Sequence, residues 1–165
     1  MLSPDLFDRN PDAIAAHLED AAHYPGGHTD AVARPRSETD VAAVLAEGRP
    51  VLAVGAQSSL TGGATPAGAI VLSTARLTTI DAPADGTVRA GAGVVVGTLL
   101  EDLARHGLDF PPVPTYLGAT VGGIVATNAA GAATFKYGTT REWVAGLTVV
   151  LAGGDVIDLT RGEHI

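Results

Sequence analysis

Two stretches rich in glycine and other small residues constrain most strongly what this chain can fold into. The first is Gly55-Ala56-Gln57-Ser58-Ser59-Leu60-Thr61-Gly62-Gly63, and the second runs from Pro114 to Gly131. Glycine supplies 21 of the 165 residues, about 13%, nearly twice the roughly 7% of an average protein. The glycines follow no three-residue repeat and Val, Leu and Ile are abundant, which excludes collagen-like and disordered chains. The two stretches therefore indicate backbone freedom, or close approach to the backbone, within a folded domain.

Composition narrows the class of protein. The 46% hydrophobic content is enough for the core of one domain, residues 1–165. Because 18 acidic residues face 10 scattered basic ones, for a net charge of −8, we expect no nucleic-acid partner. The absence of cysteine excludes disulfides and thiolate chemistry. The histidines lack a ligand spacing, so no metal site is predicted: His17, His23, His28, His106 and His164.

No secretory signal or membrane span is expected. The N-terminus, Met1-Leu2-Ser3-Pro4-Asp5, lacks a basic start and an apolar run, and no apolar stretch approaches the roughly 18 residues of a span. The sequence therefore predicts a cytoplasmic protein without a transmembrane segment.

The hydrophobic periodicity predicts a mixed α and β fold. Four helices are expected: one from Pro11, capped by Asn10, that ends before Tyr24, and others over residues 37–48, 96–106 and 121–128. Buried strands are expected over residues 51–54, 69–72 and 87–90, the last entered by the turn Asp85-Gly86, and an antiparallel hairpin over 147–159 turns at Gly153-Gly154. Prolines at 111, 112 and 114 favour an extended loop over 110–120.

The first small-residue stretch has the composition of a phosphate-binding loop. It follows a predicted strand, and successive N–H groups of such a loop can form a concave anion site, with hydroxyl donors from Ser58, Ser59 and Thr61. It is not a Walker loop or a dinucleotide fingerprint, because it lacks Gly-Lys-Ser/Thr and Gly-x-Gly-x-x-Gly. A tight surface loop stabilised by Ser and Thr hydrogen bonds explains this stretch equally well.

The second stretch offers a surface of small residues along which an extended ligand can lie. Its polar side chains for such a ligand are Thr120 and Asn128. The alternative is a helix that packs closely on its neighbour through those same small residues.

Together the stretches resemble the FAD-binding domain of the vanillyl-alcohol oxidase and para-cresol methylhydroxylase class, closest to the glycolate oxidase and D-lactate dehydrogenase type of FAD-linked oxidase. The similarity is carried by Gly55–Gly63, Pro112-Val113-Pro114-Thr115, Ala119–Gly131 and Lys136-Tyr137-Gly138-Thr139-Thr140-Arg141-Glu142-Trp143-Val144, and covers roughly residues 30–160. It implies a two-lobed α+β FAD-binding domain of the para-cresol methylhydroxylase type, C-terminally truncated, with the substrate domain absent.

The resemblance also implies the cofactor and its contacts. The first loop would hold the FAD pyrophosphate and the second segment the isoalloxazine and ribityl side. The implied residues are Gly55, Ala56, Gln57, Ser58, Ser59, Leu60, Thr61, Gly62, Pro114, Thr115, Gly118, Ala119, Thr120, Gly122, Gly123, Ala126, Thr127, Asn128 and Gly131. Where members of the class attach flavin through a loop histidine, this chain has Gln57-Ser58-Ser59, so non-covalent FAD is expected.

The function implied is oxidation of a 2-hydroxy acid, such as D-lactate or glycolate, to the 2-oxo acid. In the similar enzymes the substrate gives a proton to a base and a hydride to flavin, and that base lies in a later domain. We therefore assign no catalytic residue here and expect this chain alone to be inactive. The alternative functions are a non-catalytic nucleotide-binding or interaction module that retains the fold, and a structural partner domain. Tyr137 and Trp143 are expected in the core, while Arg141 and Lys136 are either near cofactor charges or in surface ion pairs.

Overall fold

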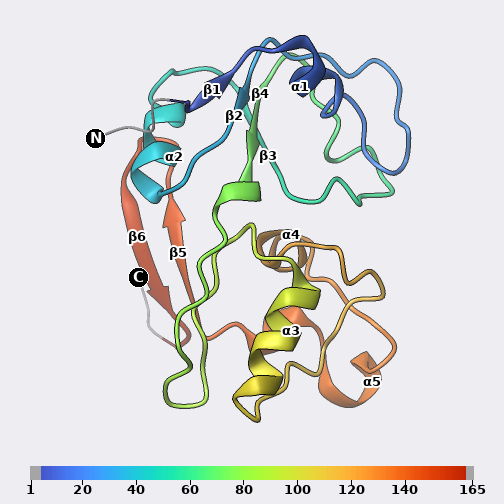
Figure 1. Ribbon diagram of the computed structural model, residues 1–165, viewed down its shortest axis with the longest axis vertical. Coiled ribbons are helices and arrows are strands. Elements are labelled where there is room, and N and C mark those ends of the chain that lie inside the picture. The colour runs from blue at the N-terminus through green and yellow to red at the C-terminus, as the bar shows by residue number, and fades with distance from the viewer. Residues whose placement is uncertain (1–4, 163–165) are drawn as a thin grey trace. The chain divides into compact units, whose positions relative to one another are not determined.

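The computed structural model describes residues 5–162, which form two compact units (Figure 1). The first unit contains residues 5–76 together with Val149–Ile157, and the second contains Leu77–Thr148 with residues 158–162. Met1–Pro4, used above to exclude a signal sequence, and His164 lie outside the described residues.

The first unit is built on a four-stranded sheet in the order β1-β2-β4-β3, formed by Phe7–Asp8, Val32–Ala33, Ile70–Ser73 and Val51–Val54. β4 runs parallel to both β2 and β3, whereas β1 is antiparallel to β2. The predicted strands over 51–54 and 69–72 are confirmed. All four residues of β4 are buried, but in β3 only Val54 is. Sequence reasoning missed β1 and β2.

Two helices of this unit begin where side-chain caps predict. In α1, Pro11–Ala15, Asn10 Oδ1 accepts a hydrogen bond from the Asp12 amide at 2.9 Å. In α2, Glu38–Leu45, the Ser37 hydroxyl accepts from the Asp40 amide at 3.2 Å. α1 ends at Ala15, well before Tyr24. A short 3-10 helix, η1, covers Thr74–Arg76.

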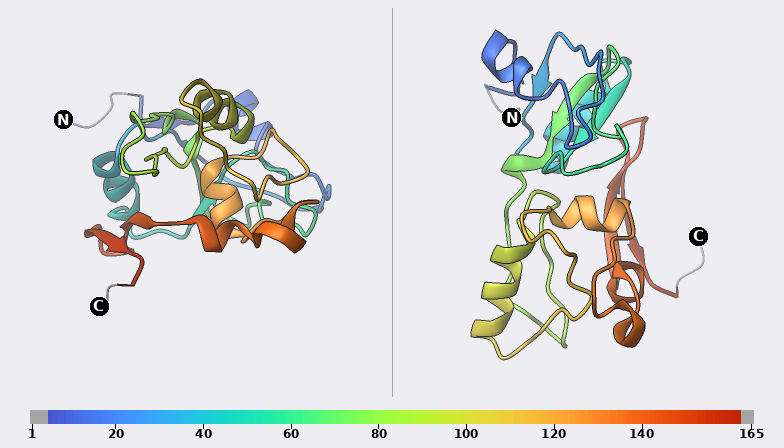
Figure 2. Two further views of the ribbon diagram at one scale, coloured as in Figure 1. Left: turned by 90° about the horizontal axis from the view of Figure 1, so that it is seen from below. Right: turned by 90° about the vertical axis from the view of Figure 1, so that its right-hand side faces the viewer.

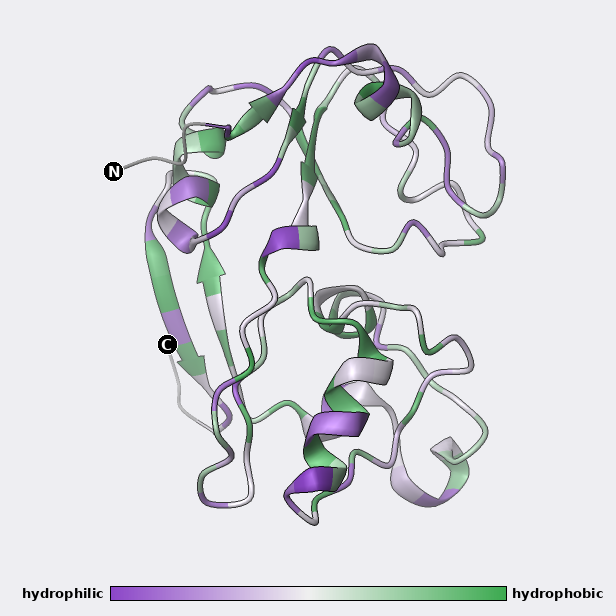
Figure 3. Ribbon diagram, viewed as in Figure 1, coloured by the Kyte–Doolittle hydropathy of each residue, from purple (hydrophilic) through white to green (hydrophobic). Residues whose placement is uncertain are grey.

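The second unit packs two helices over two small apolar clusters. The helices are α3, Val96–Arg105, and α4, Val121–Ala126. One cluster joins Val94, Leu99 and Leu103, and the other joins Val96, Ala119 and Ile124. Figure 3 shows the alternation of hydrophobic and hydrophilic residues along α3 that places these leucines inside. Both helices confirm the sequence prediction, and Gly107, with φ of +70°, follows α3 as expected of a helix stop.

The predicted hairpin is also present. β5, Gly146–Val150, and β6, Val156–Thr160, form a separate two-stranded sheet, and their arrows run in opposite directions in Figures 1 and 2. The Leu151 amide donates to the Asp155 carbonyl at 2.8 Å and Gly154 adopts φ of +90°, which closes the turn.

Two predictions about this part of the chain are wrong. Residues 87–90 form no regular strand, because they make only the isolated bridges Ala84–Thr87 and Ile80–Ala90 around the predicted Asp85-Gly86 turn. Tyr137 and Trp143 are 39% and 43% exposed rather than in the core. They lie on two short helices that were not predicted, α5, Thr134–Tyr137, and α6, Thr140–Trp143. The indole N–H of Trp143 donates to the Tyr137 carbonyl at 2.8 Å, which holds its polar edge at the surface.

Among residues 5–162, no helix is long and apolar enough to cross a membrane. The same residues contain no group of three or more His, Asp or Glu side chains that could hold a metal ion.

Candidate cofactor-binding segments

The loop over residues 55–63 follows the carboxyl end of β3, and hydrogen bonds to the segment between β1 and β2 hold it in place. Gln57 adopts φ of +52°, and its side-chain amide donates to the Glu19 carbonyl at 2.8 Å. The Gln57 carbonyl accepts from the Ala21 amide at 2.9 Å. Gly62 has φ of +77°, and a Cβ there would meet the Tyr24 ring at 2.9 Å, so only glycine fits. The Gln57 side chain is therefore an anchor of the loop.

The main-chain amides of this loop are largely free. Within residues 5–162, the amides of 56–60 donate no hydrogen bond, and the Thr61 amide donates only a long one, 3.3 Å, to Ser59 Oγ. The hydroxyls of Ser59 and Thr61 lie 3.0 Å apart and share a hydrogen bond. Gly55, Gln57, Ser59 and Gly62 are half-buried, whereas Ala56, Ser58, Leu60 and Thr61 are exposed. The loop thus presents unused N–H donors, with one Ser–Thr pair stabilising it.

Asp20 holds the end of this loop at Ala64, a role that sequence reasoning did not predict. Its carboxylate is buried, at 3% exposure, and accepts from the amides of Ala22 at 3.0 Å and Ala64 at 3.3 Å. The partner Ala64 lies 44 residues away, so no local pattern signals this role.

The second segment uses most of its amides internally. Thr120 is 6% exposed and caps α4, its hydroxyl accepting from the Gly123 amide at 3.3 Å. Amides that donate to carbonyls of the same unit include those of Ala119, Val121, Gly122, Ile124, Thr127, Asn128 and Ala129. Within residues 5–162, the amides of 115–118 donate no hydrogen bond, so this segment offers a ligand free N–H groups only before α4 and otherwise its side chains and surface.

Glycines of the second segment permit close packing. A Cβ on Gly122 would lie 2.8 Å from Ala92 Cβ, and one on Gly131 would lie 1.9 Å from the Val113 carbonyl oxygen. Pro114, Ala119 and Thr120 are buried, Gly118, Gly122, Gly123, Asn128 and Gly131 are half-buried, and Thr115, Ala126 and Thr127 are exposed. The close-packing interpretation therefore accounts for Gly122 and Gly131.

Asn128 connects α4 to α6. It adopts φ of +48°, and its Oδ1 accepts from the Arg141 amide at 2.9 Å. Beside it, the Ala129 carbonyl accepts from the hydroxyl of Thr140, a residue only 1% exposed, at 2.8 Å. The Asn128 oxygen expected to face a ligand is thus used to hold Arg141.

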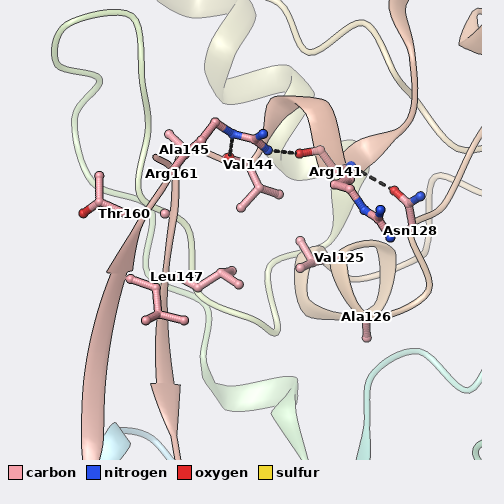
Figure 4. A pocket seen from close by; sticks show the side chains of 11 residues that line it. Val125, Ala126, Asn128, Arg141, Val144, Ala145, Leu147, Thr160 and Arg161 are labelled. Carbon is pink, nitrogen blue, oxygen red and sulfur yellow. Dashed lines mark hydrogen bonds between the residues drawn. The ribbon is translucent and has the colours of Figure 1, made fainter. Parts of the chain in front are cut away.

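An open pocket of about 450 Å³ lies beside this connection (Figure 4). The Arg161 Nε donates to the Val144 carbonyl at 2.8 Å, and another guanidinium nitrogen donates to the Arg141 carbonyl. Of the residues predicted to bind FAD, only Ala126 and Asn128 line it. The full lining is Val125, Ala126, Asn128, Arg141, Val144, Ala145, Gly146, Leu147, Leu159, Thr160 and Arg161.

The acidic neighbour of Arg141 in the chain is otherwise engaged. Glu142 Oε2 accepts from the Thr139 hydroxyl at 2.6 Å and the Thr139 amide at 2.5 Å. These hydrogen bonds, the hydroxyl one first, lower the pKa of Glu142 below its ordinary value of 4.5. No carboxylate of residues 5–162 lines the pocket.

Comparison with known proteins identifies the class. The FAD binding domain family matches residues 29–160, and the chain belongs to this family. It is 39% identical over 159 residues to a D-lactate dehydrogenase of Archaeoglobus fulgidus, covering 93% of this chain and 34% of that protein. It is 32% identical to glycolate oxidase subunit GlcD of Bacillus subtilis, with 93% and 34% covered. The chain thus spans about a third of the length of these relatives.

Solved structures support the same fold. The structure of 6-hydroxy-D-nicotine oxidase from Arthrobacter nicotinovorans superposes with a TM-score of 0.81 at 28% identity, over 98% of this chain and 36% of that one. The expected α+β FAD-binding fold of the para-cresol methylhydroxylase type is confirmed.

Proposed function

We propose that this chain is the FAD-binding portion of a flavin-dependent oxidoreductase that oxidises a 2-hydroxy acid of the D-lactate or glycolate type to the 2-oxo acid. The family membership and the names of the relatives support the cofactor and the reaction class. When bound, FAD supplies the redox chemistry. Because the chain spans a third of those relatives, we further propose that the catalytic base and the substrate domain belong to additional polypeptide, and that residues 1–165 alone form only the FAD-binding domain and turn over no substrate.

The observation that carries the proposal is the run of amides over residues 56–60 that donate no hydrogen bond to any described residue. Successive N–H groups around a residue with positive φ, here Gln57, form the kind of concave site that binds phosphate oxygens. We assign this loop, Gly55 to Gly62, to the FAD pyrophosphate. In the second unit we assign the surface of residues 114–131 to the isoalloxazine and ribityl part, through exposed positions such as Thr115, Ala126 and Thr127.

The loop contains no histidine, so we propose that FAD is held without a covalent bond. We also propose a cytoplasmic location and no nucleic-acid partner, as the sequence predicts. We assign no electron acceptor.

FAD binding is tested by equilibrium dialysis and by the visible spectrum of the purified chain. Ser58→Asp places a negative charge among the free amides and should weaken FAD binding at least about tenfold, because like charges repel. Thr39→Asp, at an exposed position of α2, adds the same charge elsewhere in the first unit and should leave binding unchanged. A colourless protein that ignores added FAD would contradict the proposal and favour a non-catalytic module. Acid precipitation should release FAD into the supernatant, and flavin retained by the pellet would contradict non-covalent binding.

A further inference from the structure

The pocket beside α6 combines two guanidinium groups with an apolar wall. Arg141 and Arg161 both line it, and no aspartate or glutamate of the described part of the chain does, in a chain of net charge −8. We propose that this pocket binds an oxyanion, a carboxylate or phosphate group attached to a small apolar body. This inference adds a ligand site to the proposed function. It rests on the proposed function only for the identity of the molecule, hydroxy acid or nucleotide, that carries the anionic group.

Arg161 is already held in place. Its two hydrogen bonds, to the carbonyls of Val144 and Arg141, attach the end of β6 to the end of α6 (Figure 4). A guanidinium carries five N–H donors, of which these bonds use two. Because its orientation is fixed by the main chain, little further ordering is needed for the remaining donors to bind an anion.

Arg141 has a fixed backbone and a free head group. The Asn128 side chain holds its amide, and the neighbouring Thr140 is buried against the Ala129 carbonyl. Its guanidinium makes no hydrogen bond or ion pair with any residue from 5 to 162. Two nearby carboxylates accept hydrogen bonds from other residues, Glu142 from Thr139 and Asp158 from Thr148, although the charge of Arg141 adds a smaller contribution to the lowered pKa of Glu142. A guanidinium that lines a pocket and donates no hydrogen bond to residues 5–162 keeps its donors for an external anion.

An apolar part of the lining sets the kind of ligand. It is formed by Val125, Val144, Leu147 and Leu159, and Leu147 remains 41% exposed. A volume of about 450 Å³ accommodates a small acid or one end of a nucleotide, and not a long polyanion. Two kinds of molecule carry an anionic group that fits this pocket: a hydroxy acid, through its carboxylate, and a nucleotide, through its phosphate.

The test uses the sole tryptophan, Trp143, which precedes the pocket residue Val144 on the chain. Its fluorescence is followed while the 165-residue chain is titrated separately with sodium phosphate, D-lactate and sodium chloride at constant ionic strength. We expect saturation with phosphate or D-lactate but not chloride. Arg141→Gln should weaken that binding about tenfold, as loss of a charge-assisted hydrogen bond does, and Arg141→Lys should retain part of it.

Arg105→Gln is the matched control, because Arg105 lies in the same unit, its side chain is 67% exposed, and among residues 5–162 its one ion-pair partner is Asp102. It removes the same charge and should not change anion binding. Circular dichroism should show both Gln variants folded. Saturation by phosphate alone identifies a phosphate-bearing ligand, and saturation by D-lactate alone a carboxylate. No saturation by either anion, or equal weakening in Arg141→Gln and Arg105→Gln, would overturn the pocket assignment.

FAD dialysis on the same samples separates the two proposals. If wild-type protein binds phosphate or D-lactate but no FAD, the proposed function fails and the anion pocket stands. If it binds FAD but neither small anion, the pocket assignment fails and the proposed function stands.

Discussion

Replacement of Gly122 by alanine tests whether the glycines of the second segment serve close packing. Gly122 is the second residue of α4, and its amide donates to the Ala92 carbonyl at 2.8 Å. An added Cβ would lie 2.8 Å from Ala92 Cβ and 3.0 Å from the Ala92 oxygen. Two carbons pack best at about 3.5–4.0 Å, so the neighbours must move by roughly 0.7–1.2 Å.

The magnitude follows from two opposing terms. Forcing a methyl group into packed surroundings costs about 1–3 kcal/mol. Alanine recovers up to about 1 kcal/mol through its helix propensity. We therefore expect Gly122→Ala to destabilise the second unit by about 1–2 kcal/mol.

Gly97 provides the control because its position is closely matched. It is the second residue of α3, and its amide also donates to a carbonyl, that of Leu117, at 3.0 Å. Its added Cβ would find the Leu117 oxygen at 3.6 Å and Leu117 Cβ at 3.9 Å, which are ordinary contacts. Gly97→Ala should therefore stabilise by about 0.5–1 kcal/mol.

The assay is urea denaturation followed by fluorescence of Trp143, which lies in the same unit as both glycines. We expect the midpoints of the two variants to move in opposite directions from the wild type, with free energies of unfolding about 2 kcal/mol apart. Equal shifts in one direction would show that the approach of Ala92 to Gly122 has no energetic consequence, and the packing argument would be refuted.

Two further predictions concern the connections around α6. Asn128→Ala should destabilise the protein by about 2 kcal/mol in urea denaturation, because it removes the hydrogen bond to the Arg141 amide and leaves an alanine at φ of +48°. Asn128→Gly removes the same hydrogen bond but tolerates that φ, so it should cost only about half as much. Equal losses of stability in the two variants would contradict this. Because the pKa of folded Glu142 is lowered below 4.5, its stabilisation is complete above pH 4.5 and is lost as pH falls through the folded pKa. Glu142→Gln should therefore lower the melting temperature more at pH 7 than at pH 3, and a pH-independent loss would exclude the carboxylate as the cause.

The elements that the sequence predicted correctly are those with local causes. Asn10 and Ser37 cap α1 and α2 through bonds to amides two or three residues away, and the leucines of α3 follow a helical period. β2 escaped prediction because two residues, Val32 and Ala33, carry no periodicity. Their strand exists because it pairs with β4, nearly forty residues later.

The same distinction applies to the candidate site. Small residues mark both segments, yet a contact such as Gly122 with Ala92, or the anchoring of loop 55–63 by Asp20, depends on partners that are remote in sequence. Arg161 likewise gave no signal in sequence, since its role arises only when β6 ends beside α6.

Similar composition therefore serves two different chemistries in this chain. In the first loop, glycine and a positive φ at Gln57 leave the amides of residues 56–60 unused, which is the state that a phosphate group requires. In the second segment the amides from Val121 to Ala129 bond mainly to carbonyls of their own unit, and glycine lets Ala92 and Val113 approach. From α4 onward, charged recognition therefore falls to side chains, and Arg141, whose amide is held by Asn128 and whose guanidinium donates no hydrogen bond to residues 5–162, lines the pocket there.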